Sequence, residues 1–240
     1  MKKEKPRTIE LGSMYVGGKD RLRGAYCGGE FSIGDTAERK IQWVQWNNLL
    51  VAKHCICTNI TWDEVNKLGF IFGKVVCIDG RYYLCRSLKV GAFDSAPNEW
   101  DMLLNDIGDN LEAFDWAVTL TWGQEGAYNE KFHRVARGGT TARNWKGKDP
   151  TMSRNRIGFR PVLESLSLLP DDFGSLLGTQ VSLLGTDCKT VSGELVGFSD
   201  YDLELRSSTS PLVDCIWATA DGVTITVDRS HIDWLKGKLS

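Results

Sequence analysis

The thirty residues 131–160 carry enough positive charge to bind an anion. Their nine basic side chains are Lys131, Arg134, Arg137, Arg143, Lys146, Lys148, Arg154, Arg156 and Arg160. Asp149 is the one acid among them, so the segment has a net charge of +8 in a chain of 240 residues whose net charge is −2. Such an excess attracts anions, and guanidinium groups bind phosphate or carboxylate in a bidentate way. The segment therefore predicts capture of a negatively charged partner.

The expected contacts with this partner come from a loop in the second half of the segment. Its basic side chains would contact phosphate, and Trp145 would stack on a base or sugar, which is worth on the order of 1–3 kcal/mol per base. The alternative is that several of the arginines are architectural. The predicted ligand-binding residues of the loop are Arg143, Asn144, Trp145, Lys146, Arg154, Asn155 and Arg156.

The run Trp122-Gly123-Gln124-Glu125 is a further recognition candidate. A tryptophan with amide and carboxylate neighbours on a loop suits a sugar, a base or a peptide. The alternative is that Trp122 packs beneath the loops, and the sequence leaves both interpretations open. We therefore add Trp122 and Gln124 to the predicted ligand site.

Other chemistry-bearing residues favour structural roles. The run His54-Cys55-Ile56-Cys57 has imidazole and thiol groups, but structural zinc sites usually place two residues between paired cysteines. In a strand, Cys55 and Cys57 would share one face and His54 would point to the other. Glu99 and Asp101 cannot share a helix face at a spacing of two, so a solvated face is expected. These residues predict neither a metal site nor a catalytic pair.

Composition places the chain among globular proteins. Hydrophobic residues make up 42% and charged residues 25%, and no apolar run is long enough to cross a bilayer. The first ten residues lack the hydrophobic core of a signal peptide. The seven cysteines have no spacing typical of a disulfide framework. These features predict a cytoplasmic protein without a membrane partner.

Several local signals predict the elements of the first 165 residues. Residues 42–52 form either a strand ending in a turn at Asn47-Asn48 or a short helix. The run 61–68 carries a capping box, and the Asp79-Gly80 dipeptide between apolar runs indicates a hairpin. Apolar residues at helical spacing predict an amphipathic helix within 98–109.

The chain changes character after residue 165. Five short runs rich in β-branched residues lie between 179 and 229, with turn residues between them, and predict a small barrel. From residue 174 onward five basic and nine acidic residues give a net charge of −4. We therefore expect a flexible lead-in over 1–10, a first domain over 11–165, a linker over 166–177 and a barrel over 178–240.

The first domain resembles the formylglycine-generating enzyme (sulfatase-modifying factor) family, a branch of the C-type-lectin-like fold. The matching residues are Arg134-Val135-x-Arg137-Gly138-Gly139, Asn144-Trp145, Ser153-Arg154 and Ile157-Gly158-Phe159-Arg160. Earlier segments are similar to prophage-type proteins of this fold. The resemblance implies a tight bend at the two glycines, Phe159 in the core, and architectural roles for Arg137 and Arg160, paired with buried acids or carbonyls.

The same region departs from the oxidising members of that family. Those members resemble one another in a pair of cysteines, whereas the interval from Thr140 to Ile157 contains none. The chain has three histidines, too few for the cluster of the related iron-dependent enzymes. The resemblance thus implies a rigid frame that binds a ligand, with no catalysis and no cofactor.

The C-terminal residues resemble an Sm-like or SH3-like barrel. The similarity lies in Gly178-x-x-Val181-x-Leu183, the run from Gly193 to Tyr201, and Leu203-x-Leu205. The residues that hold a base in RNA-binding Sm proteins have no clear counterpart here. The negative charge also opposes a polyanion, so we expect the barrel to mediate self-assembly through edge strands.

These observations lead to an α+β, mainly β fold class, with a C-type-lectin-like domain followed by a small Sm-like/SH3-like β-barrel. The function expected is non-catalytic binding of an anionic small molecule, of nucleotide type, or of an acidic surface on a host protein. A phage or prophage counter-defence factor acting in the host cytoplasm as a homo-oligomer is its concrete form. The alternative is a nucleic-acid-binding protein, and a third hypothesis is an enzyme of the formylglycine type.

Overall fold

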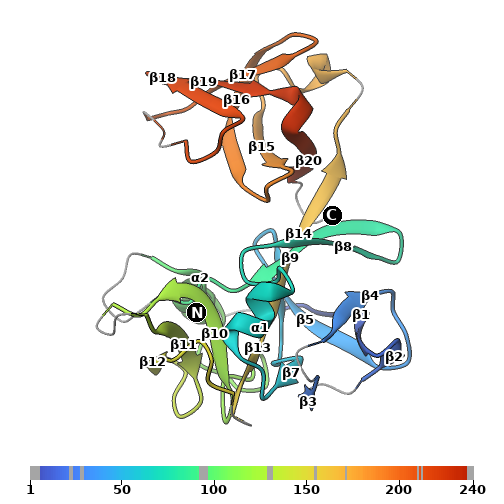
Figure 1. Cartoon of the computed structure of the whole chain (residues 1–240), viewed down its shortest axis with the longest axis vertical. Coiled ribbons are helices and arrows are strands. Elements are labelled where there is room, and N and C mark those ends of the chain that lie inside the picture. Colours follow the sequence, from blue (N-terminus) through green and yellow to red (C-terminus); the bar gives the residue numbers. More distant parts are fainter. Residues whose placement is uncertain are drawn as a thin grey trace. The chain divides into compact units, whose positions relative to one another are not determined.

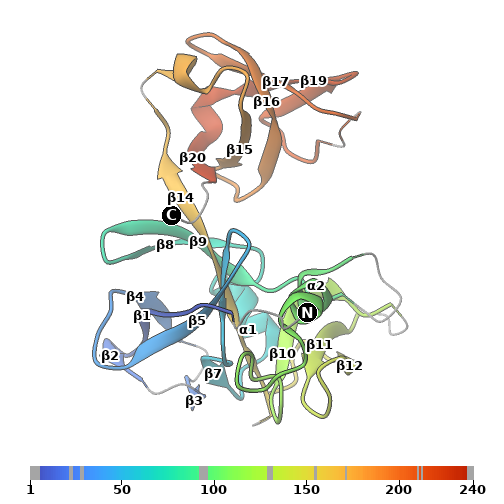
Figure 2. The same ribbon diagram turned by 180° about the vertical axis from the view of Figure 1, so that it is seen from behind.

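The computed structural model describes residues 6–21, 24–27, 30–91, 97–128, 132–153, 156–170, 172–209, 211 and 213–236. It is 48% strand and 10% helix, which confirms the mainly β class. The chain divides into two compact units, Met1–Glu164 and Ser165–Ser240. Figures 1 and 2 show these units as the blue-to-yellow and the orange-to-red parts of the ribbon. No helix in the described part of the chain is long and apolar enough to span a bilayer.

The boundaries of the predicted domains differ from the structure at two places. Strand β14 (Pro161–Leu168) runs across the expected start of the linker, and a short 3-10 helix, η1 (Phe173–Leu176), forms within it. At the other end, strand β1 (Thr8–Val16) includes the last residues of the expected lead-in. Residues 166–177 are therefore not a plain linker, because strand pairing begins there.

The first unit contains two sheets and two helices. One sheet has the order β14-β6-β5-β1-β2, with β4 paired to β1 and the β8–β9 hairpin joined through β14; the other has the order β12-β11-β10-β13-β7-β3. Besides β1 and β14, the elements are β2 (Lys19–Asp20), β3 (Ala25–Tyr26), β4 (Ser32–Gly34), β5 (Lys40–Trp46), β6 (Leu49–Ala52), β7 (Cys57–Thr58), α1 (Trp62–Lys67), β8 (Lys74–Ile78), β9 (Arg81–Ser87), α2 (Glu99–Ile107), β10 (Leu120–Gly126), β11 (Arg134–Gly138), β12 (Trp145–Lys148) and β13 (Ile157–Phe159).

The local predictions in this unit are confirmed. The strand interpretation of residues 42–52 holds, since β5 and β6 pair around a turn in which Asn47 has a φ of 51°. Thr61 caps α1 through a capping box with Glu64. The hairpin turn at Asp79-Gly80 has φ angles of 51° and 74°, as the primed turns of two-residue hairpins require. Helix α2 buries its apolar side.

The Asp79 carboxylate links this hairpin turn to the loop before β5. It accepts hydrogen bonds from the Thr36 hydroxyl at 2.5 Å and the Thr36 amide at 2.9 Å. These two hydrogen bonds hold the pKa of Asp79 below its usual value of 3.8. A carboxyl whose pKa is depressed by folding stabilises the protein above its unfolded pKa, and that contribution is lost as the pH falls through the folded pKa.

We predict that the Asp79→Asn variant loses stability near neutral pH but little in acid. The melting temperatures of the parent and the variant should differ more at about pH 6 than at about pH 3, where the parent carboxylate is also neutralised. Thermal scans at the two pH values measure this difference. A difference of the same size at both pH values would show that the ionised carboxylate is not the stabilising group.

The second unit is a single curved sheet around its own core. The order β18-β19-β17-β16-β15-β20 continues to the last residues of β14, and the core includes Phe173, Leu183, Leu205 and Trp217. A bulge between Leu195 and Gly197 shifts the register of β16 against β17. The elements are β15 (Gln180–Gly185), β16 (Thr190–Phe198), β17 (Asp202–Arg206), β18 (Ala218–Asp221), β19 (Thr224–Asp228), η2 (Arg229–His231) and β20 (Ile232–Lys236).

Candidate functional site

The structure distributes the basic segment over three strands, and two of its arginines lie inside the first unit. Arg137, on β11, is 1% exposed and pairs with Asp101 at the start of α2. It also donates to the Gly91 carbonyl at 3.2 Å. Burial lowers its pKa, and Asp101 acts in the opposite direction. The positive charge of Arg137 is therefore matched internally and is not presented to a ligand.

Arg160, directly after β13, is fully buried. Its guanidinium donates to the carbonyls of Ala52 at 2.9 Å and Lys53 at 2.6 Å, and to that of Asp115. It also donates to the Thr121 hydroxyl at 3.2 Å. Arg160 thus links β13 to three other segments of the chain, which are residues 52–53, Asp115 and Thr121.

Arg143 is half-exposed but already engaged with helix α2 and the turn after it. Its guanidinium lies 2.9 Å from the Asn105 amide oxygen, 3.5 Å from Asp101 and 3.7 Å from Asp109. The expectation that Glu99 and Asp101 form a solvated face is wrong. Asp101 binds Arg137, and Glu99 forms an ion pair with the buried Arg86. Asp101 of α2 thus pairs with Arg137 and Arg143, two arginines of the basic segment.

Two predicted ligand contacts are structural. Trp122, on β10, is fully buried, and its indole nitrogen donates to the Ile60 carbonyl at 2.8 Å. The interpretation of Trp122 as a ligand contact is therefore wrong, since the ring is enclosed by the core. Gln124, two residues on, donates to the Ser87 carbonyl at 2.9 Å. That bond links β10 to β9, so the amide has a structural partner.

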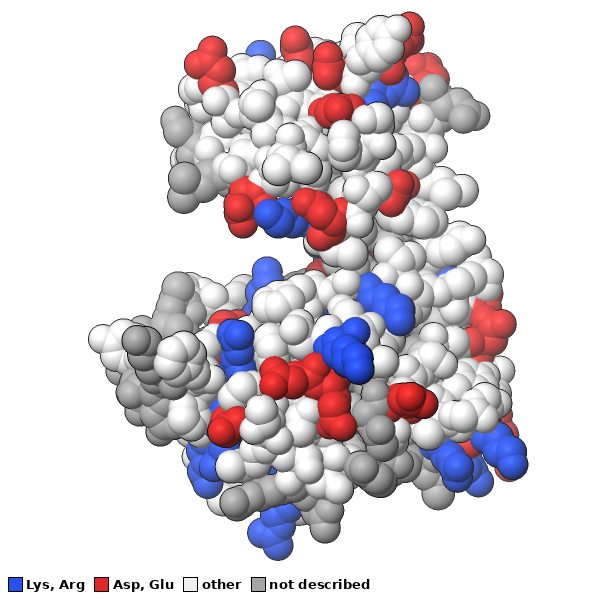
Figure 3. All heavy atoms as spheres, viewed as in Figure 1, with Lys and Arg blue, Asp and Glu red and all other residues white. Residues whose placement is uncertain are grey.

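The remaining predicted contacts are scattered. The Asn144 amide donates to the Gly138 carbonyl at 2.7 Å, and Trp145 packs against the core that surrounds α2. Lys146 and Arg156 are exposed. Arg154 and Asn155 lie outside the described residues. Figure 3 shows one face of the molecule, where basic and acidic side chains alternate over the first unit instead of forming one continuous basic patch.

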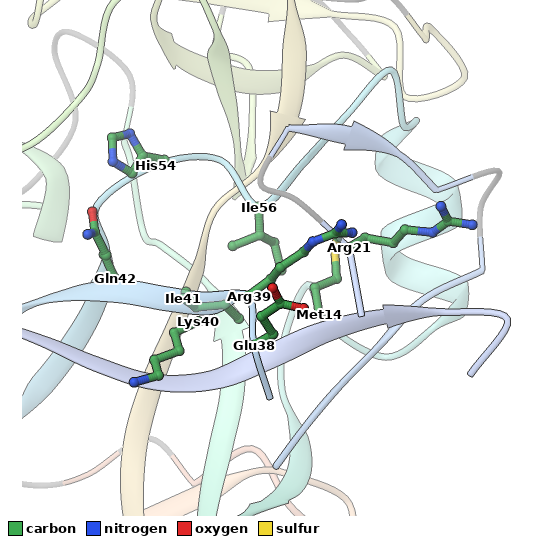
Figure 4. A pocket seen from close by; sticks show the side chains of 9 residues that line it. All are labelled: Met14, Arg21, Glu38, Arg39, Lys40, Ile41, Gln42, His54 and Ile56. Atoms are coloured by element: carbon green, nitrogen blue, oxygen red, sulfur yellow. The ribbon is translucent and has the colours of Figure 1, made fainter. Parts of the chain in front are cut away.

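A pocket on the β1–β5 side of the first unit gathers a different set of basic side chains. It has a volume of about 390 Å³ (Figure 4). Strands β1 and β5 are antiparallel neighbours, and the segment that follows β6 closes the pocket. The lining residues are Met14, Arg21, Glu38, Arg39, Lys40, Ile41, Gln42, His54 and Ile56.

The pocket has a cationic end and an apolar floor. Figure 4 shows Arg21 and Arg39 on one side, Gln42 and His54 on the other, and Ile56 between them. The Arg39 amide donates to the Asp20 carboxylate at 3.1 Å, and the Arg39 guanidinium donates to the Asp20 carbonyl at 3.3 Å. These bonds fix the position of Arg39 and leave its guanidinium with donors to spare.

The charge balance of the lining favours an anion. Three lining side chains are basic, Arg21, Arg39 and Lys40, and Glu38 is the one acidic lining residue. Lys40 also forms a long ion pair with Glu10, at 3.8 Å. Met14, Ile41 and Ile56 are buried and supply apolar contact area. Pockets that combine an apolar wall with a few polar groups are the usual sites for small ligands.

His54 stands at the end of the pocket that Arg160 supports. The His54 Nδ1 lies 2.9 Å from the Asp115 carboxylate. Arg160 binds the backbone carbonyls of Asp115 and of Ala52 and Lys53, the residues immediately before His54. The buried arginine therefore positions this wall of the pocket from behind, without contacting the cavity.

Sequence reasoning missed the pocket residues because they are far apart in the chain. Arg21 and Arg39 are separated by eighteen positions, and the pairing of β1 with β5 brings their segments together. The run Glu38-Arg39-Lys40 just before a strand was the one local signal. A short run of this kind is common on protein surfaces, so it does not indicate a site by itself.

The cysteines near this wall are buried. Cys55 contacts the Thr121 hydroxyl at 3.4 Å, and Cys57 lies within β7. Burial raises the pKa of both thiols, which keeps them protonated and poorly nucleophilic. Within the described ranges, no group of three or more His, Cys, Asp or Glu side chains could hold a metal ion.

No family model, curated protein or solved structure matches this chain.

Proposed function

We propose that the protein is a non-catalytic binding protein that captures a small anionic molecule in the pocket between Arg21, Arg39 and His54. The observation that carries the proposal is that three basic side chains line one cavity whose lining holds a single acid. The basic segment serves mainly as framework, since Arg137 and Arg160 are consumed by internal partners.

The pocket favours a ligand that has an anionic group at one end and polar groups at the other. Guanidinium groups bind phosphate or carboxylate at one side, and the polar side chains of Gln42 and His54 line the other. The apolar floor between them suits a flat or apolar body, and the volume lies in the range of pockets for small ligands. A nucleotide-type small molecule has these three features, and its sequestration by a prophage-type factor is the biological form that we propose.

The proposed fold of the first unit is C-type-lectin-like and that of the second Sm-like or SH3-like. Gly138 and Gly139, with φ angles of 88° and 87°, support the first assignment through the tight bend that the signature requires. The second is supported by a short 3-10 helix followed by strands in the order β20-β15-β16-β17-β19. Fold alone carries no function, so the ligand is argued from the pocket.

Charge reversal in the pocket is the test. In the Arg21→Glu/Arg39→Glu variant we expect the affinity for nucleoside monophosphates, measured by titration calorimetry, to fall by about 100-fold or more, since each charge-assisted bond is worth about 1.5–3 kcal/mol. Both side chains are exposed, so the melting temperature should change little.

The matched control reverses two exposed charges of the basic segment, in the Lys146→Glu/Arg156→Glu variant. Its affinity should stay within about twofold of the parent. Loss of binding in this control alone, with a steep dependence on salt, would favour the alternative of a nucleic-acid-binding surface. Equal affinity of all three proteins would exclude the pocket as the anion site.

A further inference from the structure

A second cavity adjoins the pocket of Arg21 and Arg39 in the first unit. It has a volume of about 580 Å³ and is larger than the pocket, at about 390 Å³. Gln42, on β5, lines both, so its side chain stands at the boundary between them. The residues that line the second cavity are Pro6, Thr8, Gln42, Lys53, Glu112 and Ala113.

Consecutive residues of the chain line the pocket and the second cavity. His54 lies with Gln42 on one side of the pocket, away from Arg21 (Figure 4). Lys53, the residue before it, lines the second cavity. The Lys53 amide donates to the Gln42 carbonyl at 2.8 Å, which holds residue 53 against β5. The second cavity therefore begins at the polar end of the pocket.

The second cavity has a basic side chain of its own. Among the residues that the structure describes, Lys53 forms no ion pair, although Glu112 lines the same cavity. The backbone of Lys53, by contrast, is fixed, because its carbonyl accepts from the buried Arg160 at 2.6 Å. A fixed backbone thus carries an ammonium group whose three donors can bind an anion.

The second cavity repeats the combination of groups found in the pocket. Ala113 is buried and Pro6 half-buried, and they supply an apolar wall. Lys53 supplies the cation, and Thr8 and Glu112 are polar lining residues. The pocket suits a ligand with an anionic group and a flat or apolar body. The second cavity fits a further unit of the same kind.

The two basic positions are close enough for one molecule to reach both. Arg39 precedes Gln42 by three residues, so their Cα atoms are at most about 10 Å apart. Lys53 is hydrogen-bonded directly to Gln42. A ligand that lies across Gln42 can therefore contact Arg39 at one end and Lys53 at the other.

We propose that the pocket and the second cavity together bind a molecule of two linked nucleotide units. One phosphate lies at Arg21 and Arg39, and the other lies at Lys53. The inference rests on the proposed function, because it extends the same site by a second unit. Linking the units raises the affinity, since the second contact becomes intramolecular once the first has formed.

Titration calorimetry with adenosine monophosphate (AMP) and the linear dinucleotide pApA tests the proposal. We expect the parent to bind pApA at least about tenfold more tightly than AMP, and this ratio to fall to about threefold or less in Lys53→Gln. The substitution keeps the backbone bonds of residue 53. Lys148, on β12, is also half-buried and lines neither cavity, so the matched Lys148→Gln variant should keep the ratio of the parent.

The outcomes separate this inference from the proposed function. A parent that binds neither nucleotide contradicts the proposed function, and this inference with it. AMP binding without tighter binding of pApA, or a ratio that Lys53→Gln leaves unchanged, overturns the inference alone. An affinity that keeps rising with longer oligoadenylates also overturns it, and would indicate a nucleic-acid surface.

Amide chemical shifts measured by NMR give a second readout that needs no variant. Both nucleotides should shift the signals of Arg21 and Arg39, which line the pocket. Only pApA should also shift those of Lys53 and Ala113, which line the second cavity. Signals of Lys53 and Ala113 that respond equally to AMP and pApA, or to neither, overturn the inference even if Lys53→Gln fails to fold.

Discussion

The Arg160→Met variant is expected to lose about 4 kcal/mol or more of unfolding free energy. Methionine fills much of the same space but removes the Arg160 donors from the carbonyls of Ala52 and Asp115 and leaves the Lys53 carbonyl only the Asp115 amide, at 3.1 Å. A buried acceptor that loses its partner costs about 1–3 kcal/mol, and the carbonyls of Ala52 and Asp115 both lose theirs. The guanidinium also stacks on Phe114, with its central carbon 4.2 Å from the ring centroid.

Urea unfolding of Arg160→Met and of the matched variant Arg156→Met measures this effect. Arg156 lies four residues earlier with its side chain exposed, so its replacement should change the stability by no more than about 0.5 kcal/mol. Arg160→Lys should fall between them, because an ammonium group cannot span acceptors on three segments. Equal stability of the two methionine variants would show that Arg160 does not hold the unit together.

The Gly158→Ala variant is the second substitution with a large expected effect. A Cβ at this position would lie 2.3 Å from the Cys57 carbonyl oxygen and 3.1 Å from the Cβ of Cys55. Cys57 is the first residue of β7, and Cys55 lies two residues before it. Strand β7 pairs with β13 through Gly158↔Thr58 and Phe159↔Cys57. The added methyl must push the two strands apart, which we expect to cost about 3 kcal/mol, at the upper end for overpacking.

A second glycine of the same sheet provides the control. A Cβ at Gly126, on β10, would meet its nearest atom at 3.8 Å, an ordinary contact. Gly126→Ala should therefore leave the stability unchanged or raise it by about 0.4–1 kcal/mol, because alanine restricts the unfolded chain. Calorimetric melting of both variants compares them. If Gly158→Ala and Gly126→Ala have the same melting temperature, the close approach of β7 and β13 does not constrain position 158.

Local signals in the sequence predicted the elements that need only neighbouring residues. The capping box at Thr61 and Glu64 and the turn at Asp79-Gly80 specify a helix start and a hairpin through contacts within a few residues. The burial of Phe159, which is fully enclosed and packs on Phe31 and Phe70, followed from the family resemblance and is also found. Predictions of this kind held because short-range geometry leaves few alternatives.

Tertiary pairing decided the rest, and the basic segment shows why. Charge density along the chain does not reveal that Asp101 of α2 faces Arg137, or that carbonyls from two segments and the Thr121 hydroxyl meet at Arg160. Trp122 has polar neighbours in sequence, yet the strand places its ring in the core. The pocket likewise exists only after β1 and β5 pair, so no run of residues could indicate it.

Native mass spectrometry of the protein purified from its own cells tests the central claim most directly, because it reports any retained small molecule. We predict that the parent and Lys146→Glu/Arg156→Glu carry the same added mass, lost on activation as an anion, and that Arg21→Glu/Arg39→Glu carries none. A parent without added mass, or a pocket variant that retains it, would contradict anion capture between Arg21, Arg39 and His54.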